Sequence, residues 1–182
     1  DGTNAGGLKK AFSCAVTAVD ISELALSKLA ERVPDAEIHC MDLREARLSS
    51  VLRRSSFDFG LSWGVLHFLI TDEERQSHVR DLSACMAPGS HLLLMTFAYE
   101  PGSEGLSMSR IRKSQFTQAD FRNSTREELI ELHQEYFDIV DVSNVIKKFE
   151  GSSNHAYKEH LLLFRRKMFT QTPAGPSSPG PG

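Results

Sequence analysis

The feature that most constrains the fold is an alternation of short apolar runs with longer amphipathic stretches along most of the chain. The runs with the length and composition of buried strands are residues 15–19, 37–41, 57–62, 91–97, 139–142 and 160–164. Strands that alternate with helices predict parallel strand–helix–strand units with helices on both faces of the sheet. No helix is predicted between the last two strands, so we expect an antiparallel pair there. The pattern predicts an α/β fold: a doubly wound, mostly parallel sheet with an antiparallel last strand, in three layers.

Capping residues mark where the helices begin. The candidate caps are Ser22, the pair Thr71 and Glu74, and the pair Thr125 and Glu128. We expect the helix after Thr71 to end at Pro88-Gly89, because these residues cannot easily continue a helix. The helix after Thr125 is expected to continue through Tyr136. The polar stretch 44–54 is also compatible with a helix.

Composition excludes several classes of protein. The chain has 182 residues, 25% of them charged, and a net charge of −3, close to the average for globular domains. A nucleic-acid-binding domain is usually basic, and a membrane span needs about 20 apolar residues, so neither partner is expected. The cysteines at 14, 40 and 85 are too widely spaced for a disulfide framework or a metal-ligand pair. We therefore expect a cytoplasmic protein with no metal site.

Acidic residues follow two of the predicted strands, where a doubly wound sheet binds its ligand. Asp20 closes the strand that follows Gly2 and Thr3, an order typical of folds in which a carboxylate accepts hydrogen bonds from ribose hydroxyls. Asp20 could instead cap the next helix. Asp42 follows the second strand, where it could accept a hydrogen bond from an adenine amino group while Leu43 covers the ring. The alternative for Asp42 is an ordinary turn aspartate.

The most distinctive stretch is SWGVLHFL, which continues from the third predicted strand. Ser62 and His67 offer hydrogen-bonding groups, and Trp63 offers a large ring. Gly64 allows a ligand to approach the backbone closely. This stretch is a second candidate ligand contact.

The segments VTAVDIS, MDL, FDFGLSWGVLHFL and MAPGSHLLLMTF, in this order, resemble the class I S-adenosylmethionine-dependent methyltransferases over residues 2–166. GVLHFL followed by TDEER is similar to the small-molecule methyltransferases of the thiopurine and tellurite-resistance type. The resemblance implies a Rossmann-like fold, S-adenosyl-L-methionine as cofactor and a small-molecule methyl acceptor.

The resemblance also implies which residues contact the cofactor. The implied contacts are Gly2, Thr3, Asp20, Ile21, Asp42, Leu43, Ser62, Trp63, Gly64 and His67. Within this set, Gly2 and Thr3 belong to the glycine-rich loop at the amino-acid end of the cofactor. Asp20 holds the ribose, and Asp42 and Leu43 frame the adenine. The last four residues lie at the end of the strand that lines the methyl-transfer site.

The beginning of the chain departs from the family pattern. The family's glycine-rich loop follows a central strand, and the sequence given starts at Asp1, within that loop. Without a central strand, strands 15–19 and 57–62 would lack a partner, at about 1–3 kcal/mol for each buried backbone group left unbonded. We expect the chain to be an N-terminally truncated methyltransferase domain over residues 1–167. Residues 168–182, rich in Pro, Gly and Ser, are expected to form a disordered tail.

Methyl transfer from a sulfonium is an in-line displacement that depends mainly on alignment of the two reactants and exclusion of water. For a phenol or amine acceptor, His67 is the candidate catalytic base, because the ordinary pKa of histidine is near neutrality. A packing or hydrogen-bonding role is the alternative for His67. Acceptor specificity is expected from residues 98–123 and 147–158.

Two other functions compete with an active methyltransferase. A catalytically inactive, methyltransferase-like binding module would be consistent with the incomplete glycine-rich loop. A nicotinamide-dependent oxidoreductase would also use an acid such as Asp20, but it needs a G-x-G-x-x-G turn and has no role for the SWGVLHFL stretch. We favour an active enzyme that methylates a small molecule and acts as a monomer.

Overall fold

A computed structural model describes residues 2–99, 111–113, 120–148 and 156–168. The chain divides into two compact units, residues 1–53 and 54–182, which are described in turn. The expected disordered tail lies outside the described residues, apart from its first residue, Met168. The predicted boundaries of the methyltransferase domain stay a prediction.

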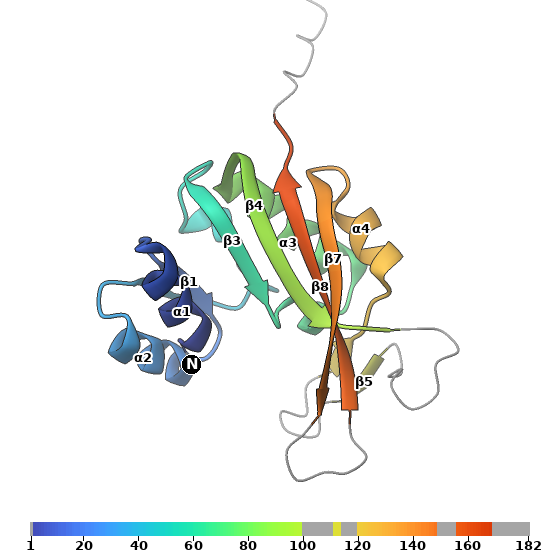
Figure 1. Ribbon diagram of the computed structural model, residues 1–182, viewed down its shortest axis with the longest axis horizontal. Coiled ribbons are helices and arrows are strands. Elements are labelled where there is room, and N and C mark those ends of the chain that lie inside the picture. The colour runs from blue at the N-terminus through green and yellow to red at the C-terminus, as the bar shows by residue number, and fades with distance from the viewer. Residues whose placement is uncertain (1, 100–110, 114–119, 149–155, 169–182) are drawn as a thin grey trace, which may run out of the picture. The chain divides into compact units, whose positions relative to one another are not determined.

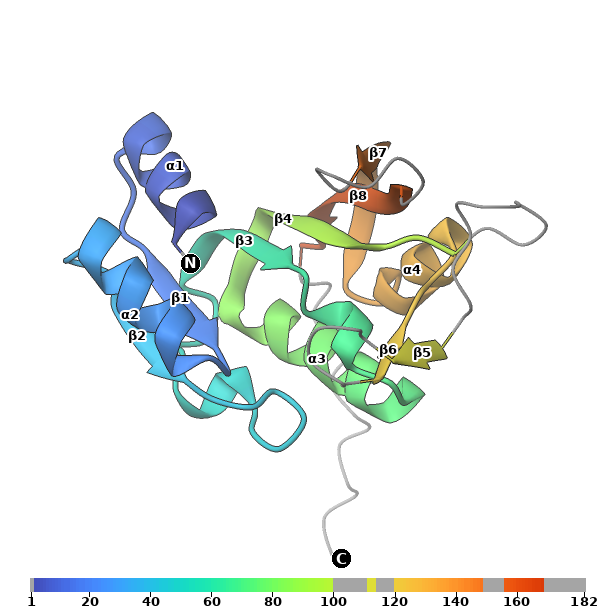
Figure 2. The same cartoon turned by 90° about the horizontal axis from the view of Figure 1, so that it is seen from below.

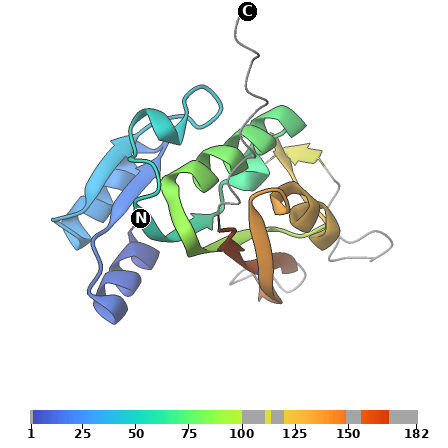
Figure 3. The same cartoon turned by 90° about the horizontal axis from the view of Figure 1, so that it is seen from above.

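The first unit is built on two parallel strands, β1 (Thr17–Asp20) and β2 (Glu37–Cys40). Helix α2 (Glu23–Arg32) packs against both strands and against α1 (Thr3–Phe12), as Figures 2 and 3 show. The predicted cap of α2 is confirmed, since Ser22 Oγ accepts a 3.2 Å hydrogen bond from the Ala25 N–H. The polar stretch 44–54 contains only a short 3-10 turn, η1 (Leu48–Ser50).

Gly2 determines how closely α1 and α2 can pack. Its φ of 74° lies in the left-handed region, and a Cβ at this position would be 2.8 Å from Leu29 Cα. At the same helix contact, Arg32 Nη1 donates a 2.7 Å hydrogen bond to Thr3 Oγ1. Both the backbone conformation and the available space therefore require glycine at position 2.

The second unit contains a four-stranded sheet in the order β3–β4–β8–β7 (Figure 1). Strand β3 (Phe57–Trp63) is parallel to β4 (Met86–Phe97). Strand β8 (Ala156–Arg166) is antiparallel to both β4 and β7 (Phe137–Lys148), which confirms the predicted antiparallel end of the sheet. Two short strands, β5 (Ile111–Lys113) and β6 (Asp120–Arg122), form a separate antiparallel pair.

Helices α3 (Asp72–Cys85) and α4 (Arg126–His133) lie on one face of this sheet (Figure 1). Both begin with the predicted capping boxes, which are confirmed. The core between helices and sheet includes Leu66, Val79, Leu92, Leu94, Leu129, Phe137, Leu162 and Phe164. Among the described residues, no helix is both long enough and apolar enough to cross a membrane.

Two predicted helix ends are wrong. Helix α3 ends at Cys85, and Pro88-Gly89 lie inside β4, where the pairing with β3 shifts register between Phe57 and Phe59. This irregularity accommodates a proline that cannot donate a ladder hydrogen bond. Helix α4 ends at His133, because the chain turns there to begin β7 at Phe137, whose side chain enters the core; Tyr136 therefore lies beyond the helix.

Candidate functional site

Asp20 is the last residue of β1, and it is exposed. Its Oδ1 accepts a 2.8 Å hydrogen bond from the Ser22 N–H, while the helix cap itself is Ser22. No other described residue donates a hydrogen bond to the Asp20 carboxylate. Asp20 is therefore not the cap of α2; it is a carboxylate held in one orientation with its second oxygen open to solvent.

The carboxyl ends of β1 and β2 meet at one edge, because the two strands are parallel. The Met41 N–H donates a 3.0 Å hydrogen bond to the Asp20 carbonyl oxygen, which brings the residues after β2 next to Asp20. Ile21 presents an apolar side chain at this edge and is 60% exposed. The structure thus brings Asp20, Ile21 and Asp42 together.

Asp42 forms a local ion pair with Arg44. The Arg44 backbone N–H donates to Asp42 Oδ1 at 2.9 Å, and its guanidinium group contacts both carboxylate oxygens, with Nη2 at 2.5 Å from Oδ2. This hydrogen bonding lowers the pKa of Asp42. The turn role considered for Asp42 is therefore observed, and both carboxylate oxygens accept hydrogen bonds from Arg44. The neighbouring Leu43 is half-buried.

Gly2 and Thr3 lie at the N-terminus of α1, where the first backbone N–H groups have no partner within the helix. Such N–H groups favour a negatively charged ligand group. The predicted role of Gly2 and Thr3 in a glycine-rich cofactor loop stays a prediction.

The second group of predicted contacts follows β3. Ser62 is 3% exposed, and its Oγ has no hydrogen-bond partner among the described residues. Trp63 is exposed by 39%. Gly64 has a φ of 73°, and its N–H donates a 3.1 Å hydrogen bond to the Met95 carbonyl oxygen on the neighbouring strand. Gly64 therefore turns the chain sharply at the end of β3.

His67 lies in the 3-10 turn η2 (Leu66–Phe68) and is only 3% exposed. The centroid of its ring lies 4.4 Å from that of Phe68 and 4.3 Å from that of Phe97. Burial, with a smaller effect of the Arg75 charge, lowers the pKa of His67 to about 4. A neutral imidazole with such a low pKa is a weak base, so the geometry favours the packing or hydrogen-bonding role over proton abstraction.

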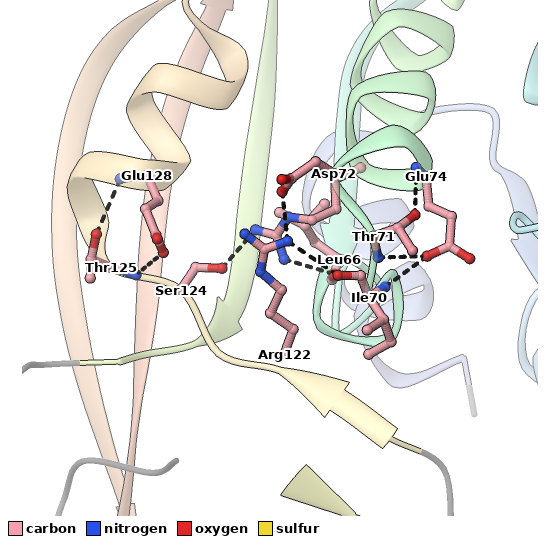
Figure 4. A network of polar contacts seen from close by, with 10 residues as sticks. Leu66, Ile70, Thr71, Asp72, Glu74, Arg122, Ser124, Thr125 and Glu128 are labelled. Atoms are coloured by element: carbon pink, nitrogen blue, oxygen red, sulfur yellow. Dashed lines mark hydrogen bonds and ion pairs between the residues drawn. The ribbon is translucent and has the colours of Figure 1, made fainter. Parts of the chain in front are cut away.

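Two arginines that the sequence analysis did not select bond to the chain around the turn that carries His67, and Figure 4 labels one of them, Arg122. Arg75, 3% exposed, donates to Ser124 Oγ at 2.6 Å and to the Leu66 carbonyl oxygen at 3.5 Å. Arg122 Nη1 donates to the Ile70 carbonyl oxygen at 3.1 Å and to Asp72 Oδ1 at 2.6 Å. The spacing contained a signal for Arg75, which precedes Val79 by four residues on the buried stripe of α3.

In a comparison with known sequence families, residues 1–89 match the family described as "Methyltransferase domain". The matched segment includes every residue that the sequence analysis proposed as a cofactor contact. Comparison with curated proteins gives no match.

Solved structures with a similar fold include several methyltransferases. A SAM-dependent methyltransferase from Methanosarcina mazei has a TM-score of 0.62 and 19% identity, over 85% of this chain and 83% of the other. The 1,6-didemethyltoxoflavin-N1-methyltransferase of Burkholderia thailandensis has a TM-score of 0.68 and 21% identity, over 92% of this chain and 67% of the other. A TehB-like SAM-dependent methyltransferase from Corynebacterium glutamicum has a TM-score of 0.60 and 14% identity, over 91% and 75%.

At these identities the structural likeness shows the fold, and it confirms the Rossmann-like α/β class. The family match over residues 1–89 adds a sequence pattern that is independent of the fold. Together they confirm the resemblance found in the sequence: residues 1–89 match the methyltransferase-domain family, and the chain shares the fold of S-adenosylmethionine-dependent methyltransferases.

Proposed function

We propose that the protein transfers a methyl group from S-adenosylmethionine to a small-molecule acceptor by in-line displacement. The observation that carries the proposal is the Asp20 carboxylate, oriented by the Ser22 N–H at the end of β1, within the matched segment. A small acceptor is supported by the net charge of −3, which disfavours nucleic acid. It is also supported by the shared fold with the B. thailandensis enzyme, whose structure contains bound 1,6-didemethyltoxoflavin.

In this proposal the residues at the ends of β1 and β2 bind the nucleoside part of the cofactor. Asp20 accepts hydrogen bonds from the ribose hydroxyls through its open oxygen. Ile21 covers an apolar surface of the nucleoside. Asp42, oriented by Arg44, accepts from the adenine amino group, and Leu43 packs against the ring.

The remaining predicted contacts bind the rest of the cofactor and order the reactants. The backbone N–H groups at Gly2 and Thr3 bind the amino-acid carboxylate. Ser62, Trp63, Gly64 and His67 line the methyl-transfer side. The cofactor supplies an already activated methyl group, so these residues need only align the acceptor and exclude water. His67 stays neutral and does not take the acceptor's proton.

Calorimetry with S-adenosylmethionine tests cofactor binding, with NAD⁺ as the comparison ligand. Asp20→Asn keeps an oxygen for the Ser22 N–H but removes the charge, so we expect affinity to fall by about tenfold or more. Asp35→Asn is the matched control, because Asp35 is an exposed aspartate of the same unit that pairs with Lys9. Equal affinities for the wild type and Asp20→Asn, or binding of NAD⁺ in place of S-adenosylmethionine, would contradict the proposal.

Release of S-adenosylhomocysteine tests turnover. The purified protein is incubated with a panel of thiols, phenols, amines and halides, and we expect release with at least one class. Cofactor binding without turnover on any acceptor would favour the inactive binding module instead.

We also propose a reducing, cytoplasmic setting and a monomer. The three cysteines, Cys14, Cys40 and Cys85, are free thiols in the structure. Size-exclusion chromatography with light scattering measures the oligomeric state, and a mass near 20.3 kDa is expected.

A further inference from the structure

Buried polar atoms without a partner lie at the carboxyl ends of β3 and β4. They are Ser62 Oγ, next to the end of β3, Thr96 Oγ1, next to the end of β4, and His67 Nδ1 in the turn after β3; none has a hydrogen-bond partner among the described residues. Burying such an atom without a partner costs stability, so each calls for an explanation. Ser62 and Thr96 lie on the face that packs against α3 and α4, whereas His67 Nδ1 lies among aromatic rings.

Three phenylalanine rings lie near the His67 ring, and we call His67, Phe68, Phe97 and Phe121 the aromatic cluster. The ring centroids of His67 and Phe121 are 6.1 Å apart, and those of Phe97 and Phe121 are 5.5 Å apart. The rings come from η2, from the end of β4 and from β6. Phe68 is 37% exposed and Phe97 is half-buried, so these two offer ring surface to a ligand.

A second buried histidine of the same unit, His133, has a purely structural role and serves as a comparison for His67. His133 is 1% exposed and stacks on Phe164, with the ring centroids 4.5 Å apart. Its Nδ1, however, lies 2.7 Å from the Leu129 carbonyl oxygen and is satisfied within the helix. His67 is also buried against phenylalanine rings, in tilted and edge-on contacts, but its Nδ1 has no such partner among the described residues.

We propose that the aromatic cluster is the acceptor subsite, and that it binds a planar, neutral heteroaromatic group whose edge carries a hydrogen-bonding atom for His67 Nδ1. The planar group stacks on Phe68 and Phe97 in the offset geometry that aromatic rings prefer. A cation is disfavoured by the buried Arg75 guanidinium, and the surrounding rings give an anion little solvation. The assignment as acceptor subsite rests on the proposed methyltransferase function; the binding itself does not.

The test measures binding of 2-quinolinone to the 182-residue chain by calorimetry and ligand-detected NMR, with and without S-adenosylhomocysteine. 2-Quinolinone is planar and neutral, with N–H and C=O groups on one edge. Its fully saturated lactam analogue keeps that edge and loses planarity. We expect 2-quinolinone to bind with a Kd below about 1 mM and the saturated analogue to bind about tenfold more weakly.

Three variants locate the binding. His67→Leu should weaken 2-quinolinone binding about fivefold or more, and His67→Asn, which keeps a polar atom near the position of Nδ1, should restore part of it. Phe121→Leu should weaken binding by removing one ring. His133→Leu is the matched control: it removes a buried histidine outside the aromatic cluster and should leave binding unchanged. Circular dichroism confirms that each variant is folded before it is used.

The proposal is overturned if the planar and saturated lactams bind equally, if no binding occurs below about 1 mM, or if folded His67 and Phe121 variants bind like the wild type. A chain that binds 2-quinolinone in the aromatic cluster but not S-adenosylmethionine would retain the subsite and refute the methyltransferase function. Binding of S-adenosylmethionine without binding of 2-quinolinone would refute the subsite and leave the methyltransferase function standing.

Discussion

Arg75 Nη2 donates a 2.6 Å hydrogen bond to Ser124 Oγ, and both residues are buried, with 3% and 0% of their surface exposed. The bond joins α3 to the segment that starts α4 (Figure 4). Because the Ser124 N–H also bonds to the Phe97 carbonyl oxygen, the end of β4 belongs to the same network. Hydrogen bonds made by α3 and by the chain that follows β6 thus fix the position of the turn that carries His67.

Replacement of Ser124 by alanine should destabilise the second unit by about 1–3 kcal/mol, because it removes one partner of a buried guanidinium group. Urea unfolding followed by the fluorescence of Trp63, the single tryptophan, measures this change. Ser27→Ala, at an exposed position of α2, is the matched control and should be nearly neutral. Equal unfolding midpoints for Ser124→Ala and Ser27→Ala would show that the bond does not stabilise the unit.

Gly2→Ala should destabilise the first unit by more than about 2 kcal/mol. The left-handed backbone disfavours alanine, and the new Cβ would lie 2.8 Å from Leu29 Cα. Gly7→Ala lies in the same helix with no atom within 4 Å of the added Cβ, so it should stabilise α1 by about 0.5–1 kcal/mol. Amide hydrogen exchange in α1 and α2 distinguishes the two. If the amide hydrogens of α1 and α2 were protected from exchange equally in Gly2→Ala and Gly7→Ala, the packing of these helices would not require glycine at position 2.

The stability of the second unit should fall as the pH is lowered from 6.5 toward 4. Burial lowers the pKa of His67, His78 and His133 from 6.5 to about 4. Between these values the unfolded chain binds protons that the folded chain excludes, so the full stability is present above pH 6.5 and is lost below it. Each histidine contributes a slope of about 1.4 kcal/mol per pH unit.

Urea unfolding at pH 7, 6 and 5 measures that slope. His78→Leu removes one of the three groups and should reduce the slope by about 1.4 kcal/mol per pH unit. A free energy of unfolding that stays constant between pH 7 and 5 would show that these histidines are not held neutral by the fold.

The cofactor should protect Cys40 from alkylation. Cys40 is exposed at the end of β2, two residues before Asp42, whereas Cys85 is 2% exposed and burial raises the pKa of its thiol. Iodoacetamide should therefore modify Cys40 readily and Cys85 only after unfolding. S-Adenosylmethionine at ten times its Kd should slow the modification of Cys40 about tenfold if it covers this edge. Peptide mapping by mass spectrometry follows both sites, and an unchanged rate at Cys40 would place the cofactor elsewhere.

Much of the fold could be predicted from local patterns. The capping boxes at Thr71 and Thr125, and the cap at Ser22, depend on residues three apart in sequence, so no tertiary information was needed. The end of α3 could not be predicted in this way. Pro88-Gly89 is a helix-stop signal, yet the chain leaves the helix at Cys85 because pairing with β3 already begins at Met86.

The candidate site was predicted to a similar extent. Parallel strands bring their carboxyl ends to one edge, so the pairing of Asp20 with a residue near Asp42 could be expected from the order of the elements. The protonation state of His67 could not be predicted from the sequence. Its pKa depends on burial among side chains such as Phe97 and Phe121, which are distant in sequence, and on the charge of Arg75.

By itself, the sequence determined the order of strands and helices, the helix starts and the resemblance to a methyltransferase, because these depend on periodicity, capping and short motifs. Only the tertiary structure decided that Gly2 must be a glycine, that His67 is neutral and that Arg75 holds Ser124. Packing, desolvation and a buried hydrogen bond each depend on atoms that the fold brings together from residues far apart in the chain.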